Sequence, residues 1–194
     1  MNPGARAVAA CFPRGPRRDV RWLTGSPGID SVPSWSTRGD RIAFESNRRG
    51  DAEIYLMNAD GGDQHDISND HGANDLNPGW PPNGRSIVFT SDRDGTNDVF
   101  LINADGTNAV NLTGEPANDR NAVWSPDGTQ IAFASNRSGA VPLYALRRDG
   151  SRVSRITSDD AADTTPDWQR FSGRRQPSFL HPPRAPLTRA WQRP

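Results

Sequence analysis

Residues 124–137 read WSPDGTQIAFASNR, and closely similar stretches stand at 35–48 (WSTRGDRIAFESNR) and 80–93 (WPPNGRSIVFTSDR). Each stretch begins with a tryptophan, passes through a glycine-containing turn and a short apolar run, and ends in Ser-x-Arg. The three stretches are 45 and 44 residues apart in a chain of 194 residues. A constant period of this length indicates a protein built from repeated structural units.

Further landmarks keep the same period outside these stretches. A fourth tryptophan, Trp168, follows Trp124 by 44 residues. An aspartate stands five residues before each of the four tryptophans, an Asp-Gly pair follows each full stretch, and Leu/Ile-Thr/Ser pairs recur at the same interval. The four aspartates are Asp30, Asp75, Asp119 and Asp163. Independent landmarks that share one period make a chance resemblance untenable.

Each unit reads as four short strands. The first carries the tryptophan, and the second and third have apolar centres such as Ile42-Ala43-Phe44 and Ile54-Tyr55-Leu56-Met57. An Asp-Gly hairpin turn then leads to the fourth strand. Apolar centres without alternation mean that both faces of each small sheet are covered. The pattern predicts an all-β fold, a β-propeller with three complete four-stranded blades at about 30–68, 75–113 and 119–157.

The residues also resemble a known repeat. The phrases Trp124-Ser125-Pro126-Asp127-Gly128 and Ile131-Ala132-Phe133-Ala134-Ser135-Asn136-Arg137, followed by Asp149-Gly150, are similar to the WD40-like (PD40) repeat of the TolB-like β-propeller family. The resemblance covers roughly residues 18–170. It implies a propeller that usually has six blades, protein or peptide partners bound near the mouth of the channel, calcium held in the channel, and export to the periplasm or cell envelope.

Partial units flank the three complete ones. Residues 18–24 supply only a strand of the fourth type, and residues 163–169 only a strand of the first type. We therefore expect an incomplete propeller: a fragment, an open arc, or one part of a ring formed between chains. Residues 1–17 and the Pro- and Arg-rich residues 171–194 lack the blade pattern and are expected to be disordered. The apolar run near residue 10 is too short for a signal peptide, so none is expected in this chain.

Composition narrows the classes of function. All 23 basic residues are arginine, and without lysine neither Schiff-base chemistry nor a Walker phosphate loop is available. Residues 23–169 hold twelve Arg against twenty-two acidic residues, so the body is acidic and no nucleic-acid partner is expected. No apolar run approaches the roughly 18 residues of a membrane-spanning helix. No Gly-x-Ser-x-Gly elbow occurs, and no catalytic residue is assigned.

The repeated charges form the candidate site. The four aspartates precede the innermost strands, and three arginines that end the second strands lie on the same face of the disc: Arg48, Arg93 and Arg137. Two interpretations are open. Each aspartate can accept hydrogen bonds from the Ser and Arg of its own blade and so pin the loops. Alternatively, the aspartates form a ring of carboxylates at the channel mouth that holds a cation or a basic partner.

Two clusters bear on metal binding. The segment Asp92–Asp98 lacks the alternation of an EF-hand and its glutamate at position twelve, so it is interpreted as an inter-strand turn. His65 and His71 stand among four aspartates that offer ligands to a transition metal: Asp63, Asp66, Asp70 and Asp75. Because the other blades have no histidine there, a solvated loop is the favoured interpretation. No metal or cofactor is assigned, and channel calcium is the one ion left open.

The sequence thus favours a non-enzymatic TolB-like scaffold that mediates protein–protein interaction. The alternative is a propeller piece that gates or regulates a peptidase of the prolyl-oligopeptidase type, whose catalytic domain is absent from this chain. The end blades of an open arc would each leave an apolar face uncovered. Self-association that completes the ring is therefore also expected.

Overall fold

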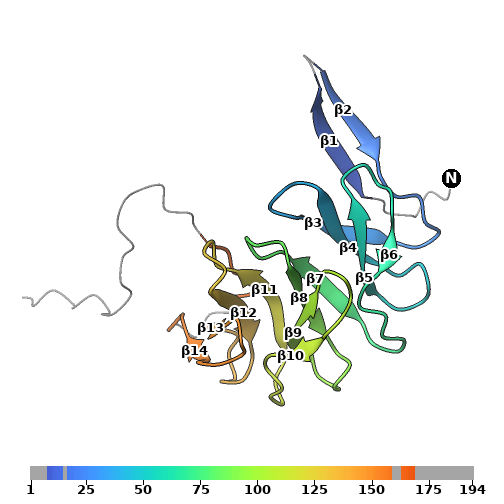
Figure 1. The fold of residues 1–194 in the computed structure, drawn as a ribbon. Coiled ribbons are helices and arrows are strands. Elements are labelled where there is room, and N and C mark those ends of the chain that lie inside the picture. Colours follow the sequence, from blue (N-terminus) through green and yellow to red (C-terminus); the bar gives the residue numbers. More distant parts are fainter. Residues whose placement is uncertain (1–7, 15–16, 159–162, 169–194) are drawn as a thin grey trace, which may run out of the picture.

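The computed structural model describes residues 8–14, 17–158 and 163–168. Within these ranges the chain forms fourteen strands and no helix. Three antiparallel sheets of four strands stand beside one another, and the remaining two strands form a hairpin (Figure 1). The predicted fold class, an all-β incomplete propeller with three four-stranded blades, is confirmed. None of the described residues belongs to a helix long and apolar enough to cross a membrane.

The strands of each blade pair in chain order. The first blade contains β3 (Asp30–Trp35), β4 (Arg41–Ser46), β5 (Glu53–Asn58) and β6 (His65–Asp66). The second contains β7 (Asp75–Gly79), β8 (Ser86–Ser91), β9 (Asp98–Asn103) and β10 (Val110–Asn111). The third contains β11 (Asp119–Trp124), β12 (Gln130–Ser135), β13 (Leu143–Arg147) and β14 (Ser154–Arg155). Each sheet lies inside one of the predicted blade ranges.

The core lies between the blades. Alternate residues of a strand point to opposite faces of its sheet, so β8 supplies Ile87 and Phe89 to one interface and Val88 to the other. The first interface joins the first and second blades, and its buried residues are Ala43, Ile54, Leu56, Ile67, Ile87, Phe89, Phe100 and Ile102. The second interface joins the second and third blades through an equivalent set. This two-sided burial explains why the apolar runs do not alternate.

Two of the sequence landmarks meet in one contact between blades. Gly106 of an Asp-Gly turn has φ +80°, and a Cβ there would lie 3.2 Å from the carbonyl oxygen of Ile67 in the preceding blade. Gly61 has φ +87°, and its Cβ would lie 2.9 Å from the carbonyl oxygen of Leu23. Glycine is required at both places because the backbone is left-handed and the neighbouring blade approaches closely. The Asp-Gly and Leu/Ile-Thr/Ser pairs therefore share a period because they touch.

The hairpin differs from the sequence-based expectation. Residues 1–17 were expected to be disordered and 18–24 to form a lone strand, but β1 (Ala9–Arg14) pairs with β2 (Arg17–Trp22) over its whole length. The expectation is wrong for residues 9–14, because pairing with β2 satisfies backbone groups that a lone strand would leave open. Residues 1–7, 15–16 and the predicted disordered tail at 171–194 lie outside the described residues.

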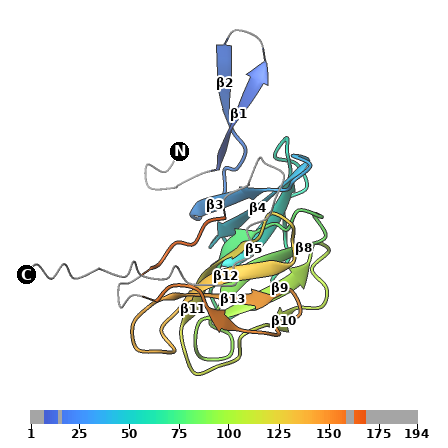
Figure 2. The ribbon, with the colours of Figure 1, turned by 90° about the vertical axis from the view of Figure 1, so that its left-hand side faces the viewer.

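The base of the hairpin repeats the contacts of the outer strands of a blade. The amide of Leu23 donates to the carbonyl of Val8 at 2.8 Å, as that of Ile67 donates to Ile54 at 2.9 Å. The amide of Val8 donates to Thr24 Oγ1 at 2.9 Å, as that of Ile54 donates to Ser68 Oγ at 2.9 Å. The hairpin thus stands where the third and fourth strands of a preceding blade would stand, and it extends beyond the first blade (Figures 1 and 2).

This arrangement closes an apolar face that was expected to be open. Val8 and Leu23 are buried against the outer face of the first blade, which carries Ile42, Phe44, Tyr55 and Met57. At the other end of the arc, the small side chains of Ala132, Ala134 and Ala145 are also buried. Among the hairpin residues whose side chains the structure describes, Val20 and Trp22 are the exposed apolar ones, at 68% and 67% exposure.

Residues 163–168 lie beside β11, the innermost strand of the third blade. The amide of Asp163 donates to the carbonyl of Val141 at 2.8 Å, as the amide of Asp75 donates to Ala52 at 2.7 Å. Trp168 Nε1 donates to the carbonyl of Val123 at 3.3 Å. Trp80 makes the same bond to Ser34 at 3.1 Å. The segment is therefore placed like a first-type strand of a further unit.

Candidate functional site

Six of the seven predicted site residues meet as three pairs. In each blade the aspartate that begins the innermost strand lies opposite the serine that ends the second strand. The arginine two residues after that serine returns to the aspartate: its guanidinium donates at 3.0 Å in the first blade, 2.9 Å in the second and 2.7 Å in the third. The pairs are Asp30–Arg48, Asp75–Arg93 and Asp119–Arg137. The strand register alone brings these charges together.

The paired carboxylates are deeply buried. The side chains of Asp75 and Asp119 are 0% exposed and that of Asp30 is 1% exposed, while the arginines are 16–19% exposed. Each guanidinium also lies over two aromatic rings of its own blade, as Arg93 lies 4.8 Å from the Phe100 centroid. A buried ion pair with this support holds the loop at the end of the second strand to the innermost strand.

The first pair has more hydrogen bonds than the other two. Asp30 Oδ1 accepts from Ser46 Oγ at 2.6 Å as well as from Arg48, and Oδ2 accepts from Ser26 Oγ at 2.8 Å. Burial raises the pKa of Asp30, but these bonds outweigh it and hold the pKa below its ordinary value. One oxygen of Asp75 and one of Asp119 are buried with no hydrogen-bond partner among the described residues.

Asp163, the seventh predicted residue, stands apart from these pairs. It is half-buried, and its Oδ2 has no hydrogen-bond partner in the part of the chain that the structure describes. Its amide bond to Val141 places it in the same position as Asp75 and Asp119 relative to the neighbouring blade. The interpretation of the four aspartates as a ring that holds a cation or a basic partner stays a prediction.

A cavity of about 450 Å³ lies along the innermost strands. Each of these strands has a bulge whose first unpaired residue is left-handed: Val32 at φ 47°, Asn77 at φ 55° and Asn121 at φ 56°. The bulges turn these residues into the cavity wall, which all three blades and the 163–168 segment share. The lining residues are Val32, Ser34, Asn77, Pro78, Gly79, Trp80, Asn121, Ala122, Val123, Trp124, Thr165 and Pro166. Sequence reasoning missed this wall, although the residue two places after each aspartate was its signal.

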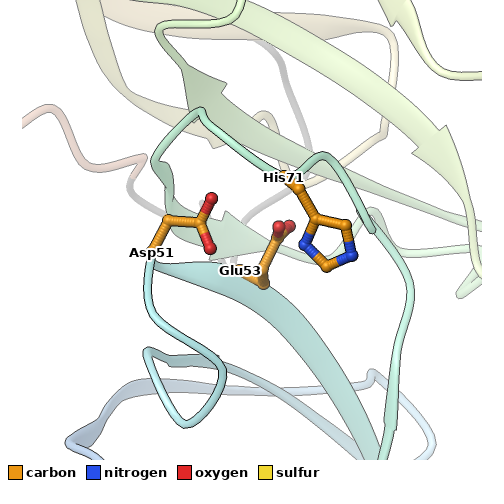
Figure 3. A group of neighbouring side chains, drawn as sticks. All are labelled: Asp51, Glu53 and His71. Atoms are coloured by element: carbon orange, nitrogen blue, oxygen red, sulfur yellow. The ribbon is translucent and has the colours of Figure 1, made fainter.

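The predicted histidine–aspartate cluster is reorganised in the structure. His65 contacts Asp63, with 3.7 Å between Nδ1 and the carboxylate. His71 instead stands beside Asp51 and Glu53, and one ligand atom from each of these three residues lies within 4.8 Å of the others (Figure 3). Asp51 and Glu53 were not singled out from the sequence, because they precede His71 by about twenty residues.

Glu53 has an unusual setting. It is 1% exposed, and its Oε2 accepts from Ser68 Oγ at 2.5 Å and from the amide of Asp70 at 3.3 Å. Its Oε1 is buried with no hydrogen-bond partner among the described residues. Burial, aided by the negative charges of Asp66 and Asp75, raises the pKa of Glu53 to about 7.

In the described ranges, the acidic 92–98 loop takes part in no group of neighbouring ligands like this one. Asp92 accepts from Asn74, while Asp94 and Asp98 accept from Asn111. These carboxylates therefore accept hydrogen bonds from the neighbouring segments at Asn74 and at β10, which fits the inter-strand turn that the sequence indicates.

Comparison with known proteins identifies the repeat. A family model described as "TolB beta propeller domain" (PD40) matches residues 63–174, more than half of the chain. The Tol-Pal system protein TolB of Bordetella pertussis is 44% identical over 45 residues, which cover 23% of this chain and 10% of that protein. This chain spans about a tenth of the length of the curated relatives it matches.

Solved structures give the same fold. A putative TolB from Agrobacterium tumefaciens superposes with a TM-score of 0.63 at 22% identity, covering 76% of this chain and 69% of that one. A puromycin-hydrolyzing peptidase of Mycobacterium tuberculosis superposes with a TM-score of 0.61 at 14% identity, covering 72% of this chain and 23% of the peptidase. At these identities the structures show a shared fold. Together with the family match, the repeated aspartate, arginine and tryptophan contacts show that this chain belongs to the TolB beta propeller domain family.

Proposed function

We propose that this chain is a non-enzymatic scaffold that binds a protein or peptide partner in the cavity along its innermost strands. The observation that carries the proposal is the cavity itself, because all three blades and the 163–168 segment contribute to its wall. Its lining combines tryptophan and proline surfaces with asparagine side chains, the mixture of apolar contact and a few polar groups that suits a bound peptide. The match to Tol-Pal system TolB proteins supports the same class of function.

The charge of the body favours a basic partner. Residues 23–169 carry ten more acidic than basic residues, which attracts a positively charged segment over a distance. Asp75 and Asp119 each have a buried oxygen without a hydrogen-bond partner among the described residues, and they begin two of the strands that form the wall. Electrostatic attraction then raises the association rate and favours basic partners, and the shape of the cavity determines which peptides fit.

A direct test uses a peptide array. The full chain is probed with synthetic peptides of graded charge, and hits are measured by fluorescence anisotropy at two salt concentrations. Ser34→Trp, which fills part of the cavity, should abolish binding. Ser154→Trp, on the exposed outermost strand of the third blade, should leave binding intact. Binding that survives Ser34→Trp, or that favours acidic peptides, would contradict the proposal.

A peptidase-associated propeller is the second candidate. It is favoured by the structural likeness to the puromycin-hydrolyzing peptidase, which extends to 23% of that chain. Reading the adjoining coding sequence separates the two candidates, since a Gly-x-Ser-x-Gly elbow there would support the peptidase. We place the scaffold in the periplasm or cell envelope by its family, and cell fractionation tests that location.

We further propose that self-association involves the hairpin. Val20 and Trp22 are two residues apart in β2 and both exposed, so they present an apolar patch on one face of the hairpin. A second copy that covers this patch also pairs an open strand. Light scattering should detect the dimer, and Trp22→Ser should return it to a monomer. A monomer of 21.2 kDa in the unmodified chain would count against this.

A further inference from the structure

The first blade carries a group of ligands that the other blades lack. Asp51 ends the turn after β4, Glu53 begins β5, and His71 lies in the connection from β6 to β7 (Figure 3). When the repeats are aligned, the positions of Asp51 and Glu53 are taken by Thr96 and Asp98 in the second blade. In the third blade they are taken by Ala140 and Pro142. Neither of those blades has a histidine in the corresponding connection. The propeller fold therefore does not require this group.

Glu53 is the buried member of the group. Its side chain is 1% exposed, and Oε1 has no hydrogen-bond partner among the described residues, whereas Oε2 has two. A buried carboxylate oxygen without a partner costs free energy that a ligand at that position recovers. The corresponding residue of the second blade, Asp98, has no such unsatisfied oxygen. One of its oxygens accepts a hydrogen bond from Thr113 and the other from Asn111.

Asp51 and the loop that carries His71 are each held in place by a polar contact. The carboxylate of Asp51 accepts a hydrogen bond from the amide of Gly72, which ties it to the loop that carries His71. The carboxylate of Asp70, the residue before His71, forms an ion pair with Arg93 at 3.2 Å. The backbone on both sides of His71 is thus anchored, while its ring is exposed and adjustable.

We propose that Asp51, Glu53 and His71 bind a divalent transition-metal ion, with Zn²⁺ as the representative. One imidazole and two carboxylates are a donor set that Zn²⁺ accepts in tetrahedral sites, with bonds of about 2.0–2.2 Å. Such bonds need donor atoms about 4 Å apart or less, so donors already within 4.8 Å of one another require only a small adjustment of the side chains. Calcium fits less well, because it takes six to eight oxygen ligands and no imidazole.

The ion has a local structural effect. It joins the turn between β4 and β5 to the connection that enters the second blade, two segments about twenty residues apart in the chain. It also neutralises two carboxylates that stand side by side. Three protein ligands leave a fourth position on the exposed side of His71, where a water molecule or a partner group completes the coordination. This site is independent of the peptide-binding cavity.

Titration calorimetry of the untagged full chain with ZnCl₂ tests the proposal. We expect one Zn²⁺ per chain, and a rise in melting temperature with added Zn²⁺ that a chelator reverses. His71→Ala changes an exposed residue, leaves folding intact, and should weaken binding by more than about tenfold. Glu53→Gln should weaken it comparably. Co²⁺ should bind to the unmodified chain and show ligand-field absorption bands that disappear in His71→Ala.

His65→Ala is the matched control. His65 is an exposed histidine of the same blade that lies outside the group, so its loss should leave Zn²⁺ affinity unchanged. The absence of stoichiometric Zn²⁺ binding would overturn the proposal. Equal weakening by His65→Ala and His71→Ala would also overturn it, since that pattern indicates scattered surface binding.

Discussion

The third strands of the first and second blades both begin with a buried acidic residue, but the hydrogen bonds of the two carboxylates differ. Asp98 in the second blade shares its two oxygens between Asn111 and Thr113. Glu53 in the first blade is one methylene longer, uses only one oxygen in hydrogen bonds, and has Asp51 and His71 beside it. The four strands of the two blades pair in the same order.

The comparison separates contacts that every blade needs for its structure from residues that occur in one blade and are not needed for the fold. The Asp–Arg pair recurs because each blade must hold the loop after its second strand to its innermost strand. The Asp-Gly turn recurs because each sheet contacts the preceding one in the same way. Glu53 and His71 occur once. A residue that departs from the repeat while leaving a buried group unsatisfied is a better candidate for function than one that recurs.

The largest expected effect concerns the Asp–Arg pairs of these two blades. Arg93→Ala leaves the fully buried Asp75 without its cation and should lower the free energy of unfolding by about 3–5 kcal/mol. Arg48→Ala should cost less, about 1–3 kcal/mol, because Asp30 keeps bonds from Ser46 and Ser26. Urea unfolding measures both, with the exposed Arg38→Ala as control. Equal losses would show that the serine bonds in the first blade are unimportant.

The next effect concerns the turn that touches the preceding blade. Gly106→Ala places a Cβ close to the carbonyl oxygen of Ile67 and forces alanine into the left-handed region. It should lower the free energy of unfolding by about 2–3 kcal/mol. Gly84→Ala has φ +63° but open space around its Cβ, and should cost about 1 kcal/mol. Gly61→Ala then reports on the hairpin. If Leu23 is as firmly packed as Ile67, thermal unfolding will show a loss at least equal to that of Gly106→Ala; a loss near that of Gly84→Ala would mean a loosely held hairpin.

A smaller effect is expected at the bulges of the innermost strands. Val32 is a β-branched residue at φ 47°, where the second and third blades have asparagine. Because asparagine tolerates the left-handed region and valine does not, Val32→Asn should raise the free energy of unfolding by about 1 kcal/mol. Asn77→Val should lower it by a similar amount. Chemical denaturation of both variants checks the pair, and an unchanged Val32→Asn would show that the first bulge carries no strain.

The smallest effect is the pH dependence due to Asp98. Burial raises its pKa above the ordinary 3.8, although hydrogen bonds from Asn111 and Thr113 offset part of the rise. The folded state therefore holds this proton more tightly than the unfolded state. The contribution is complete below the ordinary pKa and is lost as pH rises through the raised value. The difference in unfolding free energy between the unmodified chain and Asp98→Asn should follow this course. A stability advantage of the unmodified chain that instead grows as pH rises through the raised value would contradict it.

Much of the fold was predictable from the residues. Trp35, Trp80 and Trp124 set the period, and the three sheets lie where that period puts them. The Asp–Arg proximity was also predictable, since Asp75 and Arg93 fall at ends of adjacent antiparallel strands that must lie on one side of the blade. The β1 strand was not predictable, because Ala9–Arg14 has neither alternation nor a landmark of the repeat.

The sequence by itself determined the repeat: the number of full blades, the order of strands within them, and the residues that hold each blade to the next. It could do so because a local pattern repeated at a fixed period specifies the same local structure each time. Only the tertiary structure decided that Val8 covers the first blade, that one oxygen of Glu53 has no partner in the described part of the chain, and that His71 stands beside it. Those relations join loops distant along the chain, and their meeting depends on how β5, β6 and β7 are placed in space, which no single segment encodes.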